Sequence, residues 1–206
     1  MKIELKNIMH YPRMSEETNA FSADLYIQGQ KAGFAENRGT GGPNNYRATS
    51  QKGQELIRRA EDYCKGLEPL QSSAGDESFT IEMNLDLFID DLLTAHFQQK
   101  QLERFRKKMS KEMQQGVIFG VPDQSYRCLK LPVPVSVYLT SPSCQDILAN
   151  LLRDRVLPQM RKEDTILNTN IPSQIYSKAG LDKSRFPDVI PTESHPEEDH
   201  APRRKR

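Results

Sequence analysis

The run Gly39-Thr40-Gly41-Gly42 is the segment whose residue types best fit a ligand-binding loop. Glycine lets the backbone approach an anion closely and point its N–H groups at it. Neighbouring arginine and asparagine side chains add hydrogen-bond donors, and a tyrosine adds a stacking surface. The sequence therefore predicts an anion-binding site formed by Arg38, Gly39, Gly41, Gly42, Asn44, Asn45, Tyr46 and Arg47.

The glycine run does not match either of the common nucleotide-binding motifs. It lacks the Lys-Ser/Thr pair of a P-loop, and its spacing is not G-x-G-x-x-G. It precedes a predicted helix, whose N-terminus would favour an anion, but it follows a hairpin strand. The alternative is a tight or mobile connection without a ligand. The sequence leaves both interpretations open.

A second group of candidates lies in a cation-rich stretch of a predicted helix. Residues 100–111 contain six lysines and arginines and only one acidic residue, Glu103. A basic helix can bind a phosphate backbone, an acidic partner or a membrane surface, and it can also be a solvated face with a narrow packing seam. The nucleic-acid alternative rests on Arg104, Arg106, Lys107, Lys108 and Lys111.

The sequence contains no short motif that is typical of a catalytic or metal-binding site. The chain has no H-E-x-x-H motif, no nucleophile elbow and no Cys-His signature. Asp86, Asp90 and Asp91 open a predicted helix, where acidic residues favour the positive end of the dipole. We therefore expect no metal and no cofactor. An enzyme is the third hypothesis, because a site assembled only in three dimensions stays open.

Composition limits the class of protein and its compartment. The 206 residues include 29 basic and 28 acidic ones, so net charge does not indicate a nucleic-acid partner by itself. Cys64, Cys128 and Cys144 show no CxxC spacing, which favours a reducing compartment. No apolar run approaches the length of a membrane span. We expect a soluble cytoplasmic protein, and the sequence leaves its oligomeric state open.

The N-terminal half alternates between strand and helix patterns. Period-two alternation predicts a strand over 2–8 and a hairpin over 21–37 with a type II′ turn at Gly29-Gln30. Residues 38–46 are expected to be irregular. A helix then runs from a cap at Thr49 or Ser50 to about Lys65.

The C-terminal half begins with an irregular stretch at 69–78 and a short strand at 79–83. Asn84 is expected to cap a long helix that ends near Gln115. A second hairpin spans 117–131 around Pro122-Asp123. A last helix begins at Ser141-Pro142 and ends at Pro158.

These elements predict an α+β fold with a single domain over residues 1–170. Its two hairpins and first strand would form one small antiparallel sheet, with about three helices packed mainly on one face. Residues 171–206 are predicted to be a flexible charged tail that can be removed after Ser177 without loss of stability. The basic end Arg203–Arg206 fits a localisation or nucleic-acid patch and a solubilising end equally well.

Short motifs spread along residues 1–170 resemble a group of uncharacterised proteins encoded by tailed phages and bacterial mobile elements. The motifs are Ile3–Ile8, Glu17-Thr18, Phe21–Ile27, Lys31-Ala32-Gly33, Gly39–Gly42, Phe119–Asp123 and Ile166–Asn170. The resemblance implies a phage or bacterial cytoplasm and no known activity. No functional residue is carried over from it. The first hypothesis is therefore a non-enzymatic binding protein whose glycine loop contacts an anionic small molecule or a protein partner.

Overall fold

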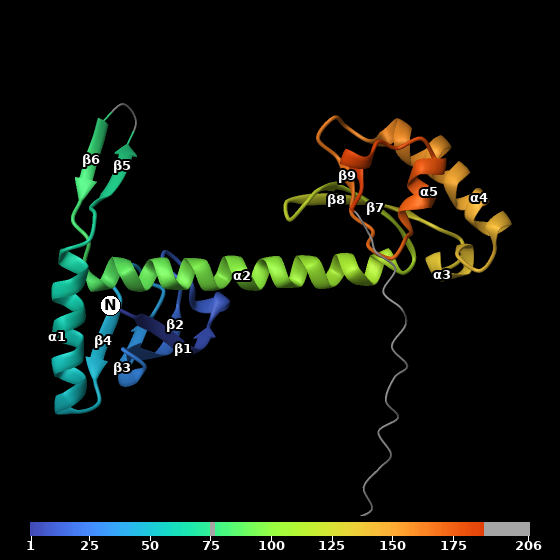
Figure 1. Ribbon diagram of the computed structural model, residues 1–206. Coiled ribbons are helices and arrows are strands. Elements are labelled where there is room, and N and C mark those ends of the chain that lie inside the picture. The colour runs from blue at the N-terminus through green and yellow to red at the C-terminus, as the bar shows by residue number, and fades with distance from the viewer. Residues whose placement is uncertain (75–76, 188–206) are drawn as a thin grey trace, which may run out of the picture. The chain divides into compact units, whose positions relative to one another are not determined.

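Alternating apolar and polar residues form the first sheet of the protein. The computed structural model describes residues 1–74 and 77–187, apart from the side chains of residues 72–74, 77 and 78. Four antiparallel strands lie in chain order (Figure 1): β1 (Ile3–His10), β2 (Phe21–Ile27), β3 (Gln30–Asn37) and β4 (Asn45–Ala48). A 3₁₀ turn at Pro12–Met14 lies between β1 and β2. The predicted first strand and first hairpin are confirmed.

The turn of this hairpin lies one residue earlier than the sequence predicts. Ile27 pairs with Gln30, so the two loop residues are Gln28 and Gly29. Both have positive φ angles, 52° and 75°. Positive φ at both positions is typical of a type I′ turn, whose twist matches that of the flanking strands.

Two helices cover the inner face of this sheet. Helix α1 (Gln51–Lys65) is capped by Ser50, whose Oγ accepts a hydrogen bond from the Gly53 N–H at 3.0 Å. Helix α2 (Leu85–Met113) is capped by Asn84 in the same way, through the Leu87 N–H at 2.9 Å. Both predicted helices are confirmed. The core that they form with the strands contains Phe21, Leu25, Ile27, Leu56, Ile57, Ala60, Leu85, Ile89 and Leu93.

Between α1 and α2 in the chain, two further strands form a hairpin that is a separate two-stranded sheet. It consists of β5 (Leu70–Ala74) and β6 (Glu77–Ile81). Strand β6 agrees with the strand predicted at 79–83, whereas β5 lies in the stretch predicted to be irregular. The pairing of Leu70 with Ile81 explains this difference, because a strand partner overrides weak local preference.

The C-terminal part contains a three-stranded sheet in the order β8-β7-β9. Strands β7 (Gly116–Val121) and β8 (Ser125–Lys130) form the predicted hairpin, and β9 (Thr165–Ile166) pairs with β7. Helix α3 (Val135–Tyr138) precedes α4 (Pro142–Leu151). A π-helical turn at Leu152–Val156 and a 3₁₀ turn at Leu157–Gln159 extend α4 to the predicted end.

The predicted tail begins too early. Helix α5 (Ser173–Lys178) and a 3₁₀ turn at Lys183–Arg185 fold against the C-terminal core. Tyr176 and Phe186 are buried there, with ring centroids 4.9 Å apart. The segment has only a few separated apolar residues, but they are buried because they pack against the C-terminal core. Residues 188–206, including the basic end, lie outside the described residues.

The α+β class with antiparallel hairpins is confirmed. The prediction that the first strand and both hairpins form one sheet is wrong, because β7 pairs with β8 and β9 and with no strand of the first sheet. The chain divides into two compact units, unit 1 (Met1–Gln101) and unit 2 (Leu102–Arg206). Each unit has its own hydrophobic core. Among the described residues, no helix is both long and apolar enough to span a membrane.

Candidate functional site

The glycine loop connects two paired strands and does not lead directly into a helix. It lies between β3 and β4, and α1 begins only after β4, at Gln51. Asn45 and Tyr46, which were expected in irregular structure, belong to β4. The positive end of the α1 dipole is therefore separated from the glycines by a strand, which removes one argument for an anion cradle.

Hydrogen bonds within unit 1 occupy the polar backbone groups of Gly39. Its N–H donates to Asn37 Oδ1 at 2.9 Å. Its carbonyl accepts from the N–H groups of Glu16 and Glu17, each at 2.9 Å, and of Thr18 at 3.3 Å. An anion cradle needs N–H groups that point outward, and Gly39 provides none. Gly39 therefore has a structural role, which is to fasten the β1–β2 connection to the loop.

The conformation of the loop explains why it contains glycines. Gly39, Gly41 and Gly42 have φ angles of 85°, 86° and 86°, a region that side chains rarely adopt. A Cβ on Gly39 would lie 2.1 Å from the carbonyl oxygen of Met14, whereas a Cβ on Gly42 would meet no atom within 4 Å. Close approach of two backbones thus requires glycine at position 39.

Asn44 is also used inside the fold. It is 6% exposed, and its Nδ2 donates to Asp90 Oδ1 at 2.8 Å and to the Asp86 carbonyl at 3.3 Å. Its backbone N–H donates to Asp86 Oδ1 at 2.7 Å, and its Oδ1 accepts from Asn37 Nδ2. Asn44 ties the loop to the first turns of α2 and is not available to a ligand.

The remaining four residues predicted to bind a ligand share one pocket on unit 1. Arg38, Asn45, Tyr46 and Arg47 line a depression of about 390 Å³ at the β3–β4 end of the sheet. Phe34 and Glu36, which the sequence does not predict as ligand contacts, complete its lining. We call these six residues the β3–β4 pocket.

Strand register places the side chains of this pocket. Phe34 pairs with Arg47, and Glu36 pairs with Asn45, so these four side chains lie on the outer face of the sheet. The neighbouring pair Ala35–Tyr46 faces the core instead. Phe34 is 42% exposed and Ala35 is buried. Period-two alternation of the predicted strand puts these neighbours on opposite faces, and this signal could have identified Phe34.

Tyr46 forms an edge of the pocket but its hydroxyl is occupied. Its Oη donates to Glu61 Oε1 at 2.9 Å. Burial raises the pKa of Tyr46 to about 12, and the bond to the Glu61 carboxylate adds to this rise. The phenol therefore stays protonated at neutral pH, and its hydroxyl is not available to a ligand in the β3–β4 pocket.

Positive charge exceeds negative charge in the β3–β4 pocket. Arg47 Nη2 lies 3.8 Å from Glu36 Oε1, a long and exposed ion pair that holds either side chain weakly. The exposed Arg38 has no hydrogen bond or ion pair to any described residue. A pocket lined by two arginines and one carboxylate can hold an anionic group through charge-assisted hydrogen bonds.

A second depression of about 340 Å³ adjoins this pocket on the outer face of the sheet. It shares Phe34, Glu36 and Arg47 with the β3–β4 pocket and is more apolar, because the exposed side chain of Met9 also lines it. Asp24, which also lines it, is held by Lys31 and Asn7, each at 2.7 Å. Lys31, and then Asn7, hold the pKa of the Asp24 carboxyl below its usual value.

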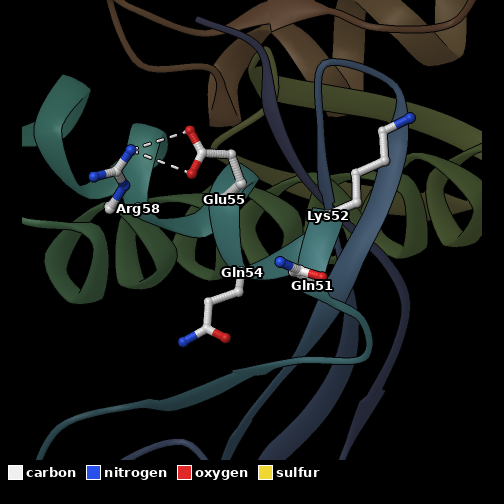
Figure 2. A pocket seen from close by; sticks show the side chains of 5 residues that line it. All are labelled: Gln51, Lys52, Gln54, Glu55 and Arg58. Carbon is white, nitrogen blue, oxygen red and sulfur yellow. Dashed lines mark hydrogen bonds and ion pairs between the residues drawn. The ribbon is translucent and has the colours of Figure 1, made fainter.

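A wider depression of about 580 Å³ lies along the exposed side of α1 (Figure 2), lined by Gln51, Lys52, Gln54, Glu55 and Arg58. Arg58 donates to both oxygens of Glu55, at 3.1 and 3.2 Å. Lys52 extends away from this pair in Figure 2. Two cations and one carboxylate line this surface, as in the β3–β4 pocket, but here the arginine is held more closely by its carboxylate than Arg47 is by Glu36.

The predicted nucleic-acid residues lie on α2 within unit 2, and they do not all share one face. Arg104, Lys107, Lys108 and Lys111 follow helical spacing and are exposed. Arg106 lies on another side, where it donates to Asp123 Oδ1 and Oδ2 at 2.8 and 2.5 Å. The structure thus separates Arg106 from the other four.

Within the described residues, no group of three or more His, Cys, Asp or Glu side chains could hold a metal ion. Asp86, Asp90 and Asp91, at the start of α2, do not form a metal-binding group. Asp86 and Asp90 instead accept hydrogen bonds from Asn44.

The chain was compared with models of protein families, with curated proteins and with solved structures, and none of the three comparisons found a match.

Proposed function

We propose that this protein is a non-enzymatic binding protein that holds an anionic ligand in the β3–β4 pocket. The observation that carries the proposal is that Arg38 and Arg47 line one depression together with a single weakly held carboxylate, Glu36 of β3. This proposal moves the expected site from the glycine backbone to the side chains on either side of it.

The other residues of the pocket define what such a ligand would look like. Phe34 offers an exposed ring next to the cations, and Asn45 offers an amide that both donates and accepts. Glu36 accepts hydrogen bonds but repels a second negative charge. A ligand that combines an anionic group with a flat or apolar part therefore fits best, as nucleotides and aromatic carboxylates do.

Thermal shift with defined anions tests this function. Sodium phosphate, sodium sulfate, AMP, ATP and benzoate serve as probes at concentrations up to 10 mM. A ligand present at ten times its dissociation constant stabilises the folded state by about 1.4 kcal/mol, which raises the midpoint by a few degrees. We expect at least one organic anion to shift the wild-type midpoint and the Arg38→Gln/Arg47→Gln variant to lose that shift.

Two further variants make the result specific to the pocket. Glu36→Gln removes the competing carboxylate and should enlarge the shift. Arg58→Gln removes an exposed arginine of α1 that does not line the pocket, and it should keep the wild-type shift. If no probe moves the wild-type melting curve, or if Arg58→Gln and the double variant behave alike, the proposal is wrong.

The cellular context in this proposal is the cytoplasm of a bacterium or of a phage-infected cell. The free state of the cysteines among the described residues is consistent with a reducing compartment. The resemblance to phage-encoded proteins supports the same context.

A further inference from the structure

The second half of α2 is an amphipathic helix with sharply different sides. Leu102, Phe105, Met109 and Met113 recur at spacings of three and four residues and are partly or fully buried within unit 2. The Phe105 ring meets Tyr126 of β8 edge-on, with centroids 5.1 Å apart. This packing fixes which side of the helix faces outward.

Four cations occupy the outward side. Arg104, Lys107, Lys108 and Lys111 stand at positions i, i+3, i+4 and i+7, so they fall within about 100° of the helix circumference and along about 10 Å of its axis. Lys108 has a distant acidic neighbour, Glu112, at 3.9 Å. The other three make no hydrogen bond or ion pair with any described residue. We call these four residues the α2 cationic face.

The geometry points to the α2 cationic face as a docking surface for the phosphate backbone of double-stranded nucleic acid. This function is independent of the β3–β4 pocket and goes beyond it. Duplex DNA carries one negative charge per 1.7 Å of axis, so about six phosphates lie along the length of this face. Four cations on one face of a helix can reach phosphates of such a backbone without any rearrangement of the helix.

Two other partners of basic helices fit less well. A membrane-surface helix needs its apolar side free to enter the lipid, and here that side packs within unit 2. A protein interface needs apolar or aromatic side chains at its centre and is depleted in lysine. The large exposed hydrophobic residues of the described chain include none from the second half of α2. Lysine and arginine without apolar neighbours are typical of phosphate contacts.

Fluorescence anisotropy with the full chain tests this inference. The probes are two fluorescein-labelled 20-base-pair DNA duplexes of unrelated sequence. If four phosphates are neutralised, affinity should fall about 100-fold between 50 and 200 mM NaCl, and equally for both duplexes. The Lys107→Gln/Lys111→Gln variant should about halve the slope of log affinity against log salt.

Arg106→Gln is the matched control, because it removes a cation from the same helix on the side that pairs with Asp123. It should keep the wild-type affinity and slope. The inference is overturned by absence of binding at 50 mM NaCl, by a double variant with the wild-type slope, or by equal losses in Arg106→Gln. Binding to phosphatidylserine vesicles without binding to either duplex would also overturn it. Circular dichroism of each variant serves as the control for folding.

Discussion

Asn44 shows how a residue with the chemistry of a ligand contact can serve the fold instead. Its amide bridges Asn37 of β3 and two aspartates at the start of α2. Asn45, the next residue, is exposed and lines the β3–β4 pocket. Asn44 precedes β4 and is buried, whereas Asn45 lies on the outer face of β4, so one side chain contributes to stability and the other lines the pocket.

Replacing these asparagines should separate the two roles. Asn44→Ala removes the side-chain hydrogen bonds to Asn37, to the Asp86 carbonyl and to the Asp90 carboxylate, and should lower the free energy of unfolding by about 2 kcal/mol. Asn45→Ala, at an exposed position, should change it by less than about 0.5 kcal/mol. Urea denaturation followed by circular dichroism measures both values. Equal effects would contradict the bridging role of Asn44.

The glycines of the loop should respond to substitution according to their surroundings. Gly39→Ala combines a positive φ with a Cβ 2.1 Å from the Met14 oxygen, so the β1–β2 connection would have to move. Gly42→Ala has only the positive φ to accommodate, which costs about 1 kcal/mol. Melting temperatures should therefore rank wild type, Gly42→Ala and Gly39→Ala in descending order, and the reverse order of the two variants would refute this role for Gly39.

Asp24 should make folding sensitive to acid. Lys31 and Asn7 lower the pKa of its carboxyl in the folded state. Because the unfolded chain has the ordinary value, near 3.9, this stabilisation is present above pH 4 and is lost as the pH falls through the lower folded value. NMR titration of the side-chain carboxyl should show the depressed pKa. Lys31→Met should move it upward, and an unchanged midpoint would contradict the assignment.

At the scale of elements, the C-terminal segment is part of unit 2 up to residue 187. Arg185 donates to the carbonyls of Asp164 and Arg161, which fastens this segment beside β9. The Asp164 carboxylate in turn accepts from Arg127 of β8. Phe186 fills the space next to Tyr176. These contacts explain why the segment folds although its sequence has little helical or strand periodicity.

Truncation after Ser177 should therefore destabilise unit 2, because it removes the buried Leu181 and Phe186. Phe186→Ala alone should lower the free energy of unfolding by about 3 kcal/mol. Arg185→Lys tests the hydrogen-bonding part and should cost less. Chemical denaturation measures all three. A Phe186→Ala variant with wild-type stability would show that the segment is not docked in solution.

At the scale of the whole molecule, the two separate cores should respond separately to substitutions of buried residues. Leu25 lies in the core of unit 1 and Leu152 in the core of unit 2, and both are fully buried. Each replacement by alanine should cost about 2–5 kcal/mol. Because the cost falls on one core, a single unfolding free energy need not describe the whole chain.

Hydrogen exchange read by mass spectrometry checks this expectation. Leu25→Ala should accelerate exchange in the strands β1 to β4, and Leu152→Ala should accelerate it in β7 to β9 and α4. Uniform acceleration across both units in either variant would indicate one cooperative unit.

The sequence by itself determined most of the elements. Period-two alternation located β1, β2 and β3, and Ser50, Asn84 and Ser141 marked the starts of three helices because an N-cap is a local hydrogen bond. The α+β class follows from the order of these elements. Strand β5 and helix α5 were missed because packing partners, and not local preference, hold them in place.

Only the tertiary structure decided which candidate residues are available for binding. The Gly39 carbonyl is occupied by backbone groups of residues 16–18, and Arg106 is occupied by Asp123. Both partners lie more than fifteen residues away along the chain, so no local pattern could reveal them. Hydrogen bonding and burial depend on which distant segments meet. The sequence could therefore nominate Arg38, Arg47 and the cations of α2, while the fold determined which of them face outward.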